Sequence, residues 1–141
     1  MISVLRGIGI VLVGVVMAVV VIVAIDFLVF TIYPLPGGAR MSDPASLRAA
    51  VPLTPVAALV GVQIAWFVGT LAGCWLATRL ARQAPILHGM SVGLAVLIAG
   101  IADVAAIPNP PHWFPITGVA AYLAGSIAGT MLAGSGSDRS A

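Results

Sequence analysis

The sequence predicts an all-α membrane protein, a bundle of four transmembrane helices, and three observations carry that prediction. Hydrophobic residues make up 61% of the 141-residue chain, charged residues make up 7%, and the mean hydropathy is +1.17. Four stretches are apolar over the roughly 20 residues that a bilayer crossing requires. Three of these stretches open on a proline, which suits the first turn of a helix because its missing N–H has no partner there.

The four expected spans form one domain over residues 1–133. Their boundaries are 8–32, 55–78, 85–107 and 115–133. Thr54 is expected to cap the second span. The first apolar run is longer than a signal peptide requires and no small-residue cleavage site follows it, so we expect a retained anchor. Residues 134–141 are small and polar, which predicts a disordered cytoplasmic tail.

Arginine placement predicts the orientation of the spans, because Lys and Arg are disfavoured in translocated loops. Two arginines follow the first span and four lie on the other side: Arg40 and Arg48 against Arg6, Arg79, Arg82 and Arg139. We therefore expect a multi-pass protein of the cell (inner) membrane with both termini in the cytoplasm. Aromatic rings prefer the membrane interface, which predicts an outer interfacial position for Tyr33, Trp66, Trp113 and Phe114.

The one sizeable polar segment, residues 33–54, is expected outside the membrane and contains a short helix. In the stretch SDPASLRAAV, Asp43 is placed to cap a helix whose first position is Pro44, and Pro52 ends it. We favour a solvated connector that packs over the helix ends. The alternative is that this extracytoplasmic helix lies on the membrane surface or on the bundle.

Small residues recur at every fourth position along the second and fourth spans. The two stripes are Gly61, Ala65, Gly69, Gly73, Ala77 and Ala81, and then Ala121, Gly125, Gly129 and Ala133. Lipid supplies little hydrophobic force between helices, so close backbone approach provides the contact, and these stripes predict helix-packing seams. The segments 71–81 and 123–133 also agree at six of eleven positions. This similarity predicts two helical hairpins related by an axis along the membrane normal.

Composition and motifs argue against nucleic acid, metal and cofactor binding. The net charge is only +2, and no lysine is present to build a basic surface for nucleic acid. Cys74 is the only cysteine, and His88 and His112 are expected on opposite sides of the membrane, so no metal site is expected. No phosphate-binding loop, dinucleotide fingerprint or haem-type cysteine pair occurs, so no cofactor is expected.

One motif resembles a catalytic pair. The stretch GMSVG places Ser91 three residues after His88, which on a helix puts both on one face. A nucleophile elbow of this pattern is a strained strand-to-helix turn, whereas this match lies within the first turns of an expected membrane helix. A glycine-rich packing face is therefore the favoured interpretation.

Five polar residues toward the outer side are the candidate binding residues: Asp26, Gln63, Asp103, Asn109 and His112. A charge at the centre of a membrane helix costs about 2.5–3.5 kcal/mol and usually faces the bundle or a water-filled cavity. Asp103 is expected on the bundle-facing side of its span, level with Asp26 and open to the outer aqueous phase, where the two could share a proton. The interpretation that we favour is that both carboxylates are wetted and accept hydrogen bonds from loop backbone such as the proline-rich turn at 108–111.

Short motifs follow one another in a recognisable order along most of the chain. They run YPLP, SDP, PLTP, then Trp66 ahead of GTLAGCW and ATRLA, His88, and AGIAD leading through prolines to HWFP. This order resembles an uncharacterised family of small bacterial four-span integral membrane proteins. The resemblance implies a bacterial membrane protein and brings with it no activity, substrate or catalytic residue. It also implies an amide at the position of Asp103 in similar sequences, which weighs against an obligatory proton carrier there.

Three function classes follow from the sequence. The first is a non-enzymatic accessory or scaffold protein that acts by helix packing with itself, as a homo-oligomer, or with a larger membrane complex. The second is a small transporter or proton-coupled carrier that uses Asp26 and Asp103. The third, an intramembrane enzyme, has only Ser91 as a candidate nucleophile. We expect the first class, with the lipid bilayer as its surroundings.

Overall fold

The computed structural model describes residues 2–40 and 42–135, and every regular element within them is helical. The elements in this part of the chain are α1 (Ile2–Ile32), η1 (Pro36–Gly38), α2 (Pro44–Ala50), η2 (Val51–Leu53), α3 (Val56–Leu80), α4 (Pro85–Ala106) and α5 (Trp113–Ser135), where η marks a 3-10 helix. The four longest helices, α1, α3, α4 and α5, are long and apolar enough to cross a membrane. The chain is therefore an all-helical protein with four candidate membrane spans.

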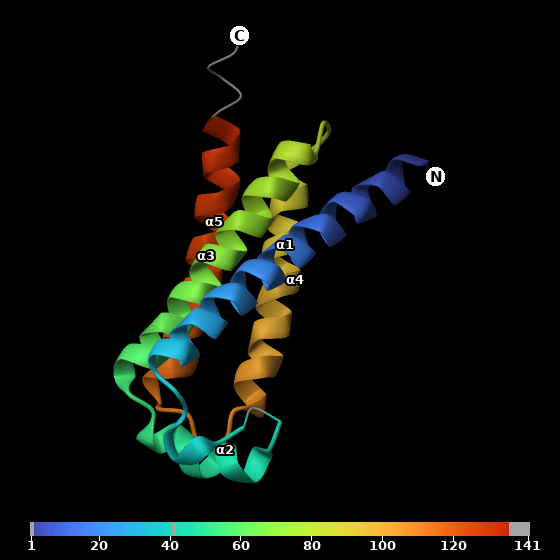
Figure 1. Cartoon of the computed structure of the whole chain (residues 1–141). Helices are drawn as coiled ribbons and strands as arrows, with labels where there is room; N and C mark the ends of the chain where they lie inside the picture. The colour runs from blue at the N-terminus through green and yellow to red at the C-terminus, as the bar shows by residue number, and fades with distance from the viewer. Residues whose placement is uncertain (1, 41, 136–141) are drawn as a thin grey trace.

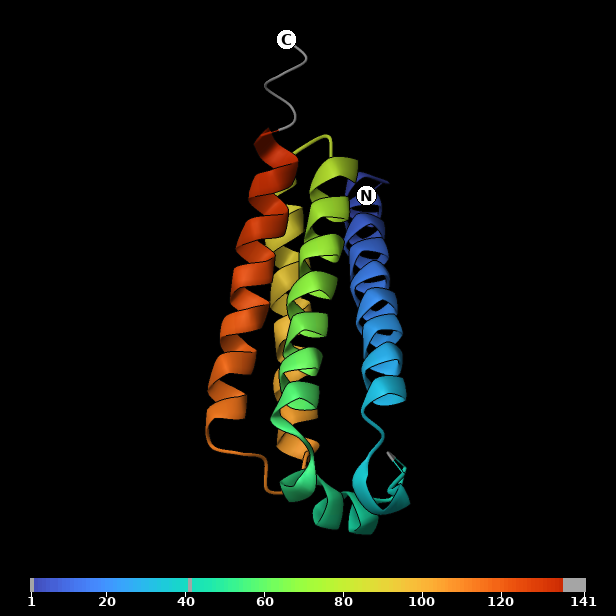
Figure 2. The same ribbon diagram turned by 60° about the vertical axis from the view of Figure 1, so that its left-hand side comes forward.

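The helix α3 lies at the centre of the bundle, where it packs extensively against α1 and α5 and also contacts α4. The start of α1, the α3–α4 turn and the end of α5 lie at one end of the molecule, here called the terminal end (Figure 1). The helix α2 and both 3-10 helices lie at the other, here called the α2 end. α1 crosses α4 near Gly14, where a Cβ atom would lie 2.7 Å from the Val92 side chain. Toward the α2 end the two helices separate (Figures 1 and 2).

Three helices extend beyond the apolar stretches that predicted them. α1 begins at Ile2 rather than at residue 8, α3 ends at Leu80 rather than at residue 78, and α5 begins at Trp113 rather than at residue 115. The reason is that hydropathy marks the part of a helix inside the hydrocarbon, whereas the helix itself continues through polar residues such as Arg6. α5 also includes Gly134 and Ser135, so the expected disordered tail is wrong at these two positions. Its remaining residues, 136–141, lie outside the described part of the chain.

The caps of α2 and α3 differ from each other. The two carboxylate oxygens of Asp43 accept hydrogen bonds from the N–H groups of Ala45 and Ser46 at the start of α2. At the start of α3 the N-cap residue is Pro55, and no side chain caps the helix. The Thr54 hydroxyl instead donates to the carbonyl oxygen of Ala50 at 3.0 Å. The expected Thr54 cap is therefore wrong, because the hydroxyl satisfies the end of the preceding helical stretch.

The small-residue stripes lie in contacts between helices of this same chain. A Cβ atom on Gly73 would lie 2.8 Å from the Ala18 Cβ atom of α1, and one on Gly125 would lie 2.6 Å from the Phe67 carbonyl oxygen of α3. These distances are too short for any side chain, so the backbones of α1, α3 and α5 approach at positions where only glycine fits. Other stripe residues are buried at the same contacts: Ala65, Gly69, Ala77 and Gly129. Two more, Gly61 and Ala121, are half-buried.

An aromatic cluster of Trp66, Phe114 and Tyr122 joins α3 to α5. The Trp66 ring stacks on Tyr122 with ring centroids 5.1 Å apart and meets Phe114 edge-on at 5.3 Å. Trp66 is 5% exposed and Phe114 is 2% exposed. Both rings therefore pack between helices, and their position relative to the membrane interface stays a prediction. The physical reason is local, because Gly118 leaves the room that the Trp66 ring fills, and a Cβ atom there would lie 2.6 Å from that ring.

Candidate functional site

A cavity of about 480 Å³ lies at the α2 end, in the region where α1 and α4 separate. Asp26 of α1 and Asp103 of α4 both line it, and these are the two carboxylates carried by the candidate spans. The first half of α3, α2 with its flanking segments, the loop after α4 and the start of α5 complete its walls. The fold thus brings the two acidic side chains, far apart in the sequence, to one space.

The two carboxylates lie at similar depth below the α2 end. Asp26 precedes the end of α1 at Ile32 by six residues, and Asp103 precedes the end of α4 at Ala106 by three. With a rise of about 1.5 Å per residue, these offsets place them about 9 Å and about 5 Å from the helix ends. The cavity is therefore closer to one end of the spans than to their midpoint.

The hydrogen-bonding capacity of the Asp26 carboxyl group is not satisfied within the described residues. Its Oδ1 atom is buried and bonds to none of the described residues, although the side chain as a whole is half-buried. Asp103 is exposed, so the cavity is open beside it. A buried acceptor without a donor costs about 1–3 kcal/mol, and a bound donor or cation would offset that cost.

The rest of the cavity wall is mostly apolar and offers few hydrogen-bond donors. Side chains such as Phe30, Leu59 and Val62 face the space. The loop after α4 contributes prolines 108, 110 and 111, and proline has no N–H to donate. The proline-rich loop is therefore a poor source of the backbone donors that wetted carboxylates would use. Two acidic groups consequently stand in a largely apolar, donor-poor cavity.

The aromatic cluster bounds the cavity on the side toward the middle of the spans. Trp66 and Phe114 line the cavity, and Tyr122 stacks on the Trp66 ring. Gly100 of α4 faces Tyr122 so closely that a Cβ atom there would overlap its ring. The three helices α3, α4 and α5 are thus held together at this level. Aromatic rings separate the carboxylates from the terminal end.

Three of the five candidate binding residues lie elsewhere. The Gln63 side-chain amide donates to the Phe114 carbonyl oxygen at 3.1 Å and to the Thr117 hydroxyl at 2.7 Å, which ties α3 to α5. Asn109 and His112 are exposed on the loop between α4 and α5, and neither lines the cavity. Of the five residues, only Asp26 and Asp103 line the cavity, whereas Gln63 links α3 to α5.

The candidate catalytic pair is not assembled. The Ser91 hydroxyl donates to the Leu87 carbonyl oxygen at 2.8 Å, and Nδ1 of His88 bonds to the Ala84 carbonyl oxygen at 3.0 Å. Each side chain thus bonds to the backbone carbonyl oxygen four residues before it, and neither bonds to the other. Within residues 2–40 and 42–135, no group of three or more His, Cys, Asp or Glu side chains could hold a metal ion.

Sequence reasoning missed two features of this region. It did not predict that Trp66 and Phe114 pack together, although Gly118, four residues after Phe114, was a signal that a large ring could fit there. It also gave no weight to Thr70, whose buried hydroxyl bonds to no described residue. A threonine beside a stripe of small residues carries no pattern that would reveal such a position.

Comparison of the chain with family models, with curated proteins and with solved structures found no match.

Proposed function

We propose that this chain is a small, non-enzymatic membrane carrier that binds a small organic cation between Asp26 and Asp103. The observation that supports this proposal is that both acidic side chains of the spans line one cavity of about 480 Å³. A cavity of a few hundred Å³ with apolar walls and a few convergent polar groups is typical of small-molecule sites. Acidic residues within membrane helices commonly mark substrate or proton pathways.

The chemistry of the cavity favours a cation with an apolar body. Two carboxylates repel each other and attract positive charge, and the buried Asp26 Oδ1 atom accepts no hydrogen bond from the described residues. Apolar walls such as Phe30 and Val62 would contact hydrocarbon groups of the ligand. An inorganic cation would need more oxygen ligands than this cavity offers.

Transport is the step that goes beyond binding. A carrier exposes its site to one side at a time, and the aromatic cluster would serve as the closed gate of the state described above. Asp26 would exchange a proton for the cation. Asp103 would assist, which fits a family resemblance that implies an amide at its position.

Binding of ethidium, an organic cation with apolar rings, tests the proposal. We expect its fluorescence to rise on addition of the purified full chain in detergent, and Asp26→Asn to weaken binding at least about tenfold, since it removes the charge from a poorly solvated site. Asp138→Asn removes one carboxylate from the tail and is the charge-matched control, with binding unchanged. Equal binding by the parent and Asp26→Asn would contradict the proposal.

An accessory role is the second candidate, and the exposure of Asp103 favours it. A charged side chain in a membrane span usually faces protein or water, so a helix of a second copy or of a larger complex could cover it. The small-residue stripes do not favour this role, because helices of the same chain already use them. Crosslinking from Asp103→Cys in cells, followed by purification and mass spectrometry, tests it, and a reproducible crosslinked partner is the supporting result.

We further propose that the protein lies in the cell (inner) membrane of a bacterium with both termini in the cytoplasm. The four-to-two division of arginines supports this orientation. It would place α2 outside the membrane and open the acidic cavity to the outer aqueous phase. The arrangement as two hairpins related by an axis along the membrane normal stays a prediction from the internal similarity.

A further inference from the structure

A second site lies at the terminal end, where two pockets meet at the same two residues. The first, about 340 Å³, lies between the start of α1, the α3–α4 turn and the start of α4. The second, about 320 Å³, continues from it between α1 and α4. Gly7 and His88 border both. A Cβ atom on Gly7 would lie 3.0 Å from His88 Nε2, so glycine leaves the junction between the pockets open.

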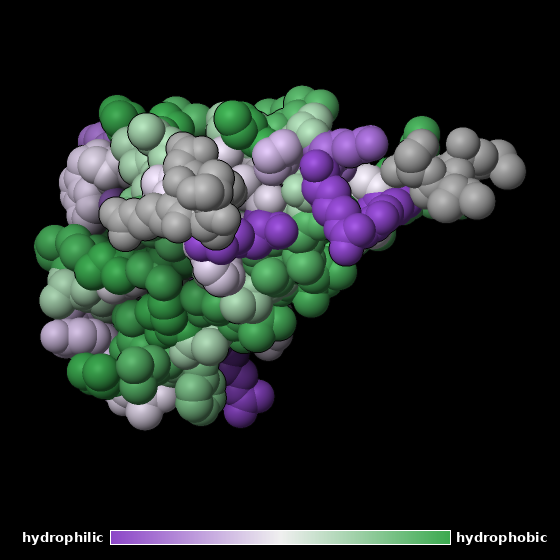
Figure 3. Space-filling view, turned by 90° about the horizontal axis from the view of Figure 1, so that it is seen from above, coloured by the Kyte–Doolittle hydropathy of each residue, from purple (hydrophilic) through white to green (hydrophobic). Residues whose placement is uncertain are grey.

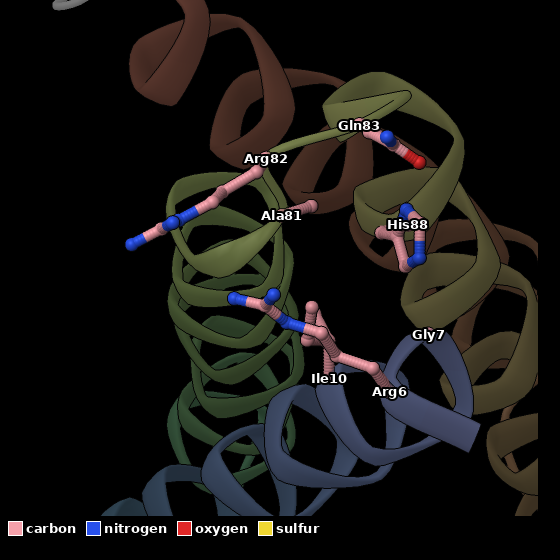
Figure 4. A pocket seen from close by; sticks show the side chains of 7 residues that line it. All are labelled: Arg6, Gly7, Ile10, Ala81, Arg82, Gln83 and His88. Carbon is pink, nitrogen blue, oxygen red and sulfur yellow. The ribbon is translucent and has the colours of Figure 1, made fainter. Parts of the chain in front are cut away.

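The first pocket is basic. Arg6, Arg82, Gln83 and His88 line it, and Figure 4 shows the two guanidinium groups on the α3 side with His88 on the α4 side. The two arginines carry positive charge into the pocket, and Nδ1 of His88 is hydrogen-bonded to the Ala84 carbonyl oxygen. Seen from this end of the molecule, hydrophilic residues gather beside the hydrophobic flanks of the helices (Figure 3).

No acidic side chain of the described residues is near enough to neutralise this charge. Asp26 lies in the last third of α1, Asp43 precedes α2, and Asp103 lies in the last turn of α4, all toward the α2 end. The segment 136–141 carries one acidic and one basic side chain, Asp138 and Arg139. The pocket therefore attracts an anion.

The second pocket is a shallow apolar groove. The exposed side chains of Val4, Ile8 and Leu12 line it from α1, and Leu87 lines it from α4. Its serine, Ser91, already donates its hydroxyl proton to the Leu87 carbonyl oxygen. The groove begins at the basic pocket and runs within candidate spans that start at Val4 and Pro85. Its position and composition fit a hydrocarbon chain.

We propose that these adjoining pockets bind one anionic glycerophospholipid, with the phosphate near Arg6 and Arg82 and an acyl chain along the groove. Guanidinium groups bind phosphate oxygens through several hydrogen bonds, and basic pockets between membrane helices are suited to anionic headgroups. The site is separate from the acidic cavity and does not depend on the proposed carrier function. Lipid bound here would join α1 to α4 at the end where α1 projects from the bundle (Figure 1).

Native mass spectrometry of the purified full chain tests this lipid site. The detergent micelles contain either dioleoyl phosphatidylglycerol or dioleoyl phosphatidylcholine, which share a phosphate and the acyl chains but differ in net charge. We expect one phosphatidylglycerol to be retained in preference to phosphatidylcholine. Arg6→Gln and Arg82→Gln should each weaken its retention about fivefold, as expected when one basic side chain near an anionic lipid is lost.

Arg79→Gln is the matched control, because Arg79 lies at the same end but stacks over the Trp75 ring, 5.5 Å from its centroid, outside the pocket. Its phosphatidylglycerol retention should equal that of the parent. Inorganic phosphate in excess distinguishes the source of the anion, and we expect it to displace the lipid poorly because it has no acyl chain. Equal retention of the two lipids, equal loss in Arg79→Gln, or full displacement by phosphate would each overturn the proposal.

Discussion

At the scale of single residues, Asp26 is central to the proposed function, and its hydrogen bonding is incomplete. Its Oδ1 atom is buried without a partner among the described residues, whereas the amide of Gln63 at a neighbouring level has two. Buried polar groups in membrane proteins are normally satisfied, and exceptions tend to mark functional positions. The contrast between these two residues leads to two predictions.

Replacement of Asp26 by leucine should stabilise the protein and abolish ethidium binding. Leucine removes the unpartnered acceptor and suits the apolar wall, so we expect the free energy of unfolding in detergent to rise by about 1–3 kcal/mol. Asp26→Asn is the control, because it keeps a polar group in the same place and should give no such gain. A loss of stability in Asp26→Leu would show that Asp26 has a structural partner.

Replacement of Gln63 by leucine should lower the stability of the protein and leave ethidium binding unchanged. It leaves the Phe114 carbonyl oxygen without the Gln63 donor and removes a link between α3 and α5. Hydrogen bonds between membrane helices contribute about 0.6–2 kcal/mol, so thermal denaturation in detergent should show a loss of that size. Ethidium binding should be unchanged, because Gln63 does not line the cavity. Impaired binding with normal stability would instead place Gln63 in the site.

Single residues mark the limit of what the sequence could predict about the site. Asp26 and Asp103 stood out because charge is rare in an apolar helix, and helical spacing indicated a shared depth. Gln63, Asn109 and His112 are also polar, but the sequence did not show which polar residues would line the cavity. Gln63 donates instead to a carbonyl oxygen and a hydroxyl of α5, and Asn109 and His112 are exposed. Which partner satisfies a polar side chain depends on how helices rotate against one another, and no local pattern encodes that rotation.

At the level of helices, the close contacts of α3 organise the bundle. Gly73 contacts α1 and the backbone of α3 accommodates Gly125 of α5, so α3 carries glycine contacts on two sides. Such stripes are readable in sequence because a repeat of four residues follows one helix face. Helix ends were harder to predict from the sequence. Hydropathy marks the hydrocarbon boundary rather than the helix end, and the Thr54 hydroxyl could bond either to the preceding helical stretch or to the start of α3.

Substitution of Gly73 by alanine tests whether the stripe fixes the helix spacing. The added Cβ atom would lie 2.8 Å from the Ala18 Cβ atom and would also meet the Gly14 backbone, so the helices must move apart. We expect a loss of about 1–3 kcal/mol in detergent denaturation, typical of overpacking. Gly9→Ala is the matched control on α1, since a Cβ atom there meets nothing within 4 Å. Similar behaviour of the two variants would mean that the stripe does not determine packing.

On the scale of the whole molecule, the two ends have opposite chemistry. An acidic cavity occupies the α2 end and a basic pocket occupies the terminal end. In the orientation that arginine placement predicts, the acidic cavity would open to the outside and the basic pocket would face the cytoplasm. Overall architecture followed from composition and span lengths, whereas the crossing of α1, which creates both cavities, had no signal in the sequence.

Cysteine labelling of intact cells tests the orientation. Ser42→Cys, in the segment between α1 and α2, should react with a membrane-impermeant maleimide, whereas Ser137→Cys should react only after the cells are permeabilised. Cys74 is buried and should contribute little background. The reverse pattern would place the acidic cavity on the cytoplasmic side.

The most direct measurement of carrier function is ethidium uptake into vesicles that contain the purified chain and an acidic lumen. Exchange of luminal protons for the external cation should concentrate the dye, with uptake well above that of empty vesicles, and Asp26→Asn should reduce uptake to the empty-vesicle level. Because proton exchange drives the uptake, a protonophore should abolish it. Uptake that is equal in the parent, in Asp26→Asn and in empty vesicles would contradict a carrier that works through the Asp26 and Asp103 cavity.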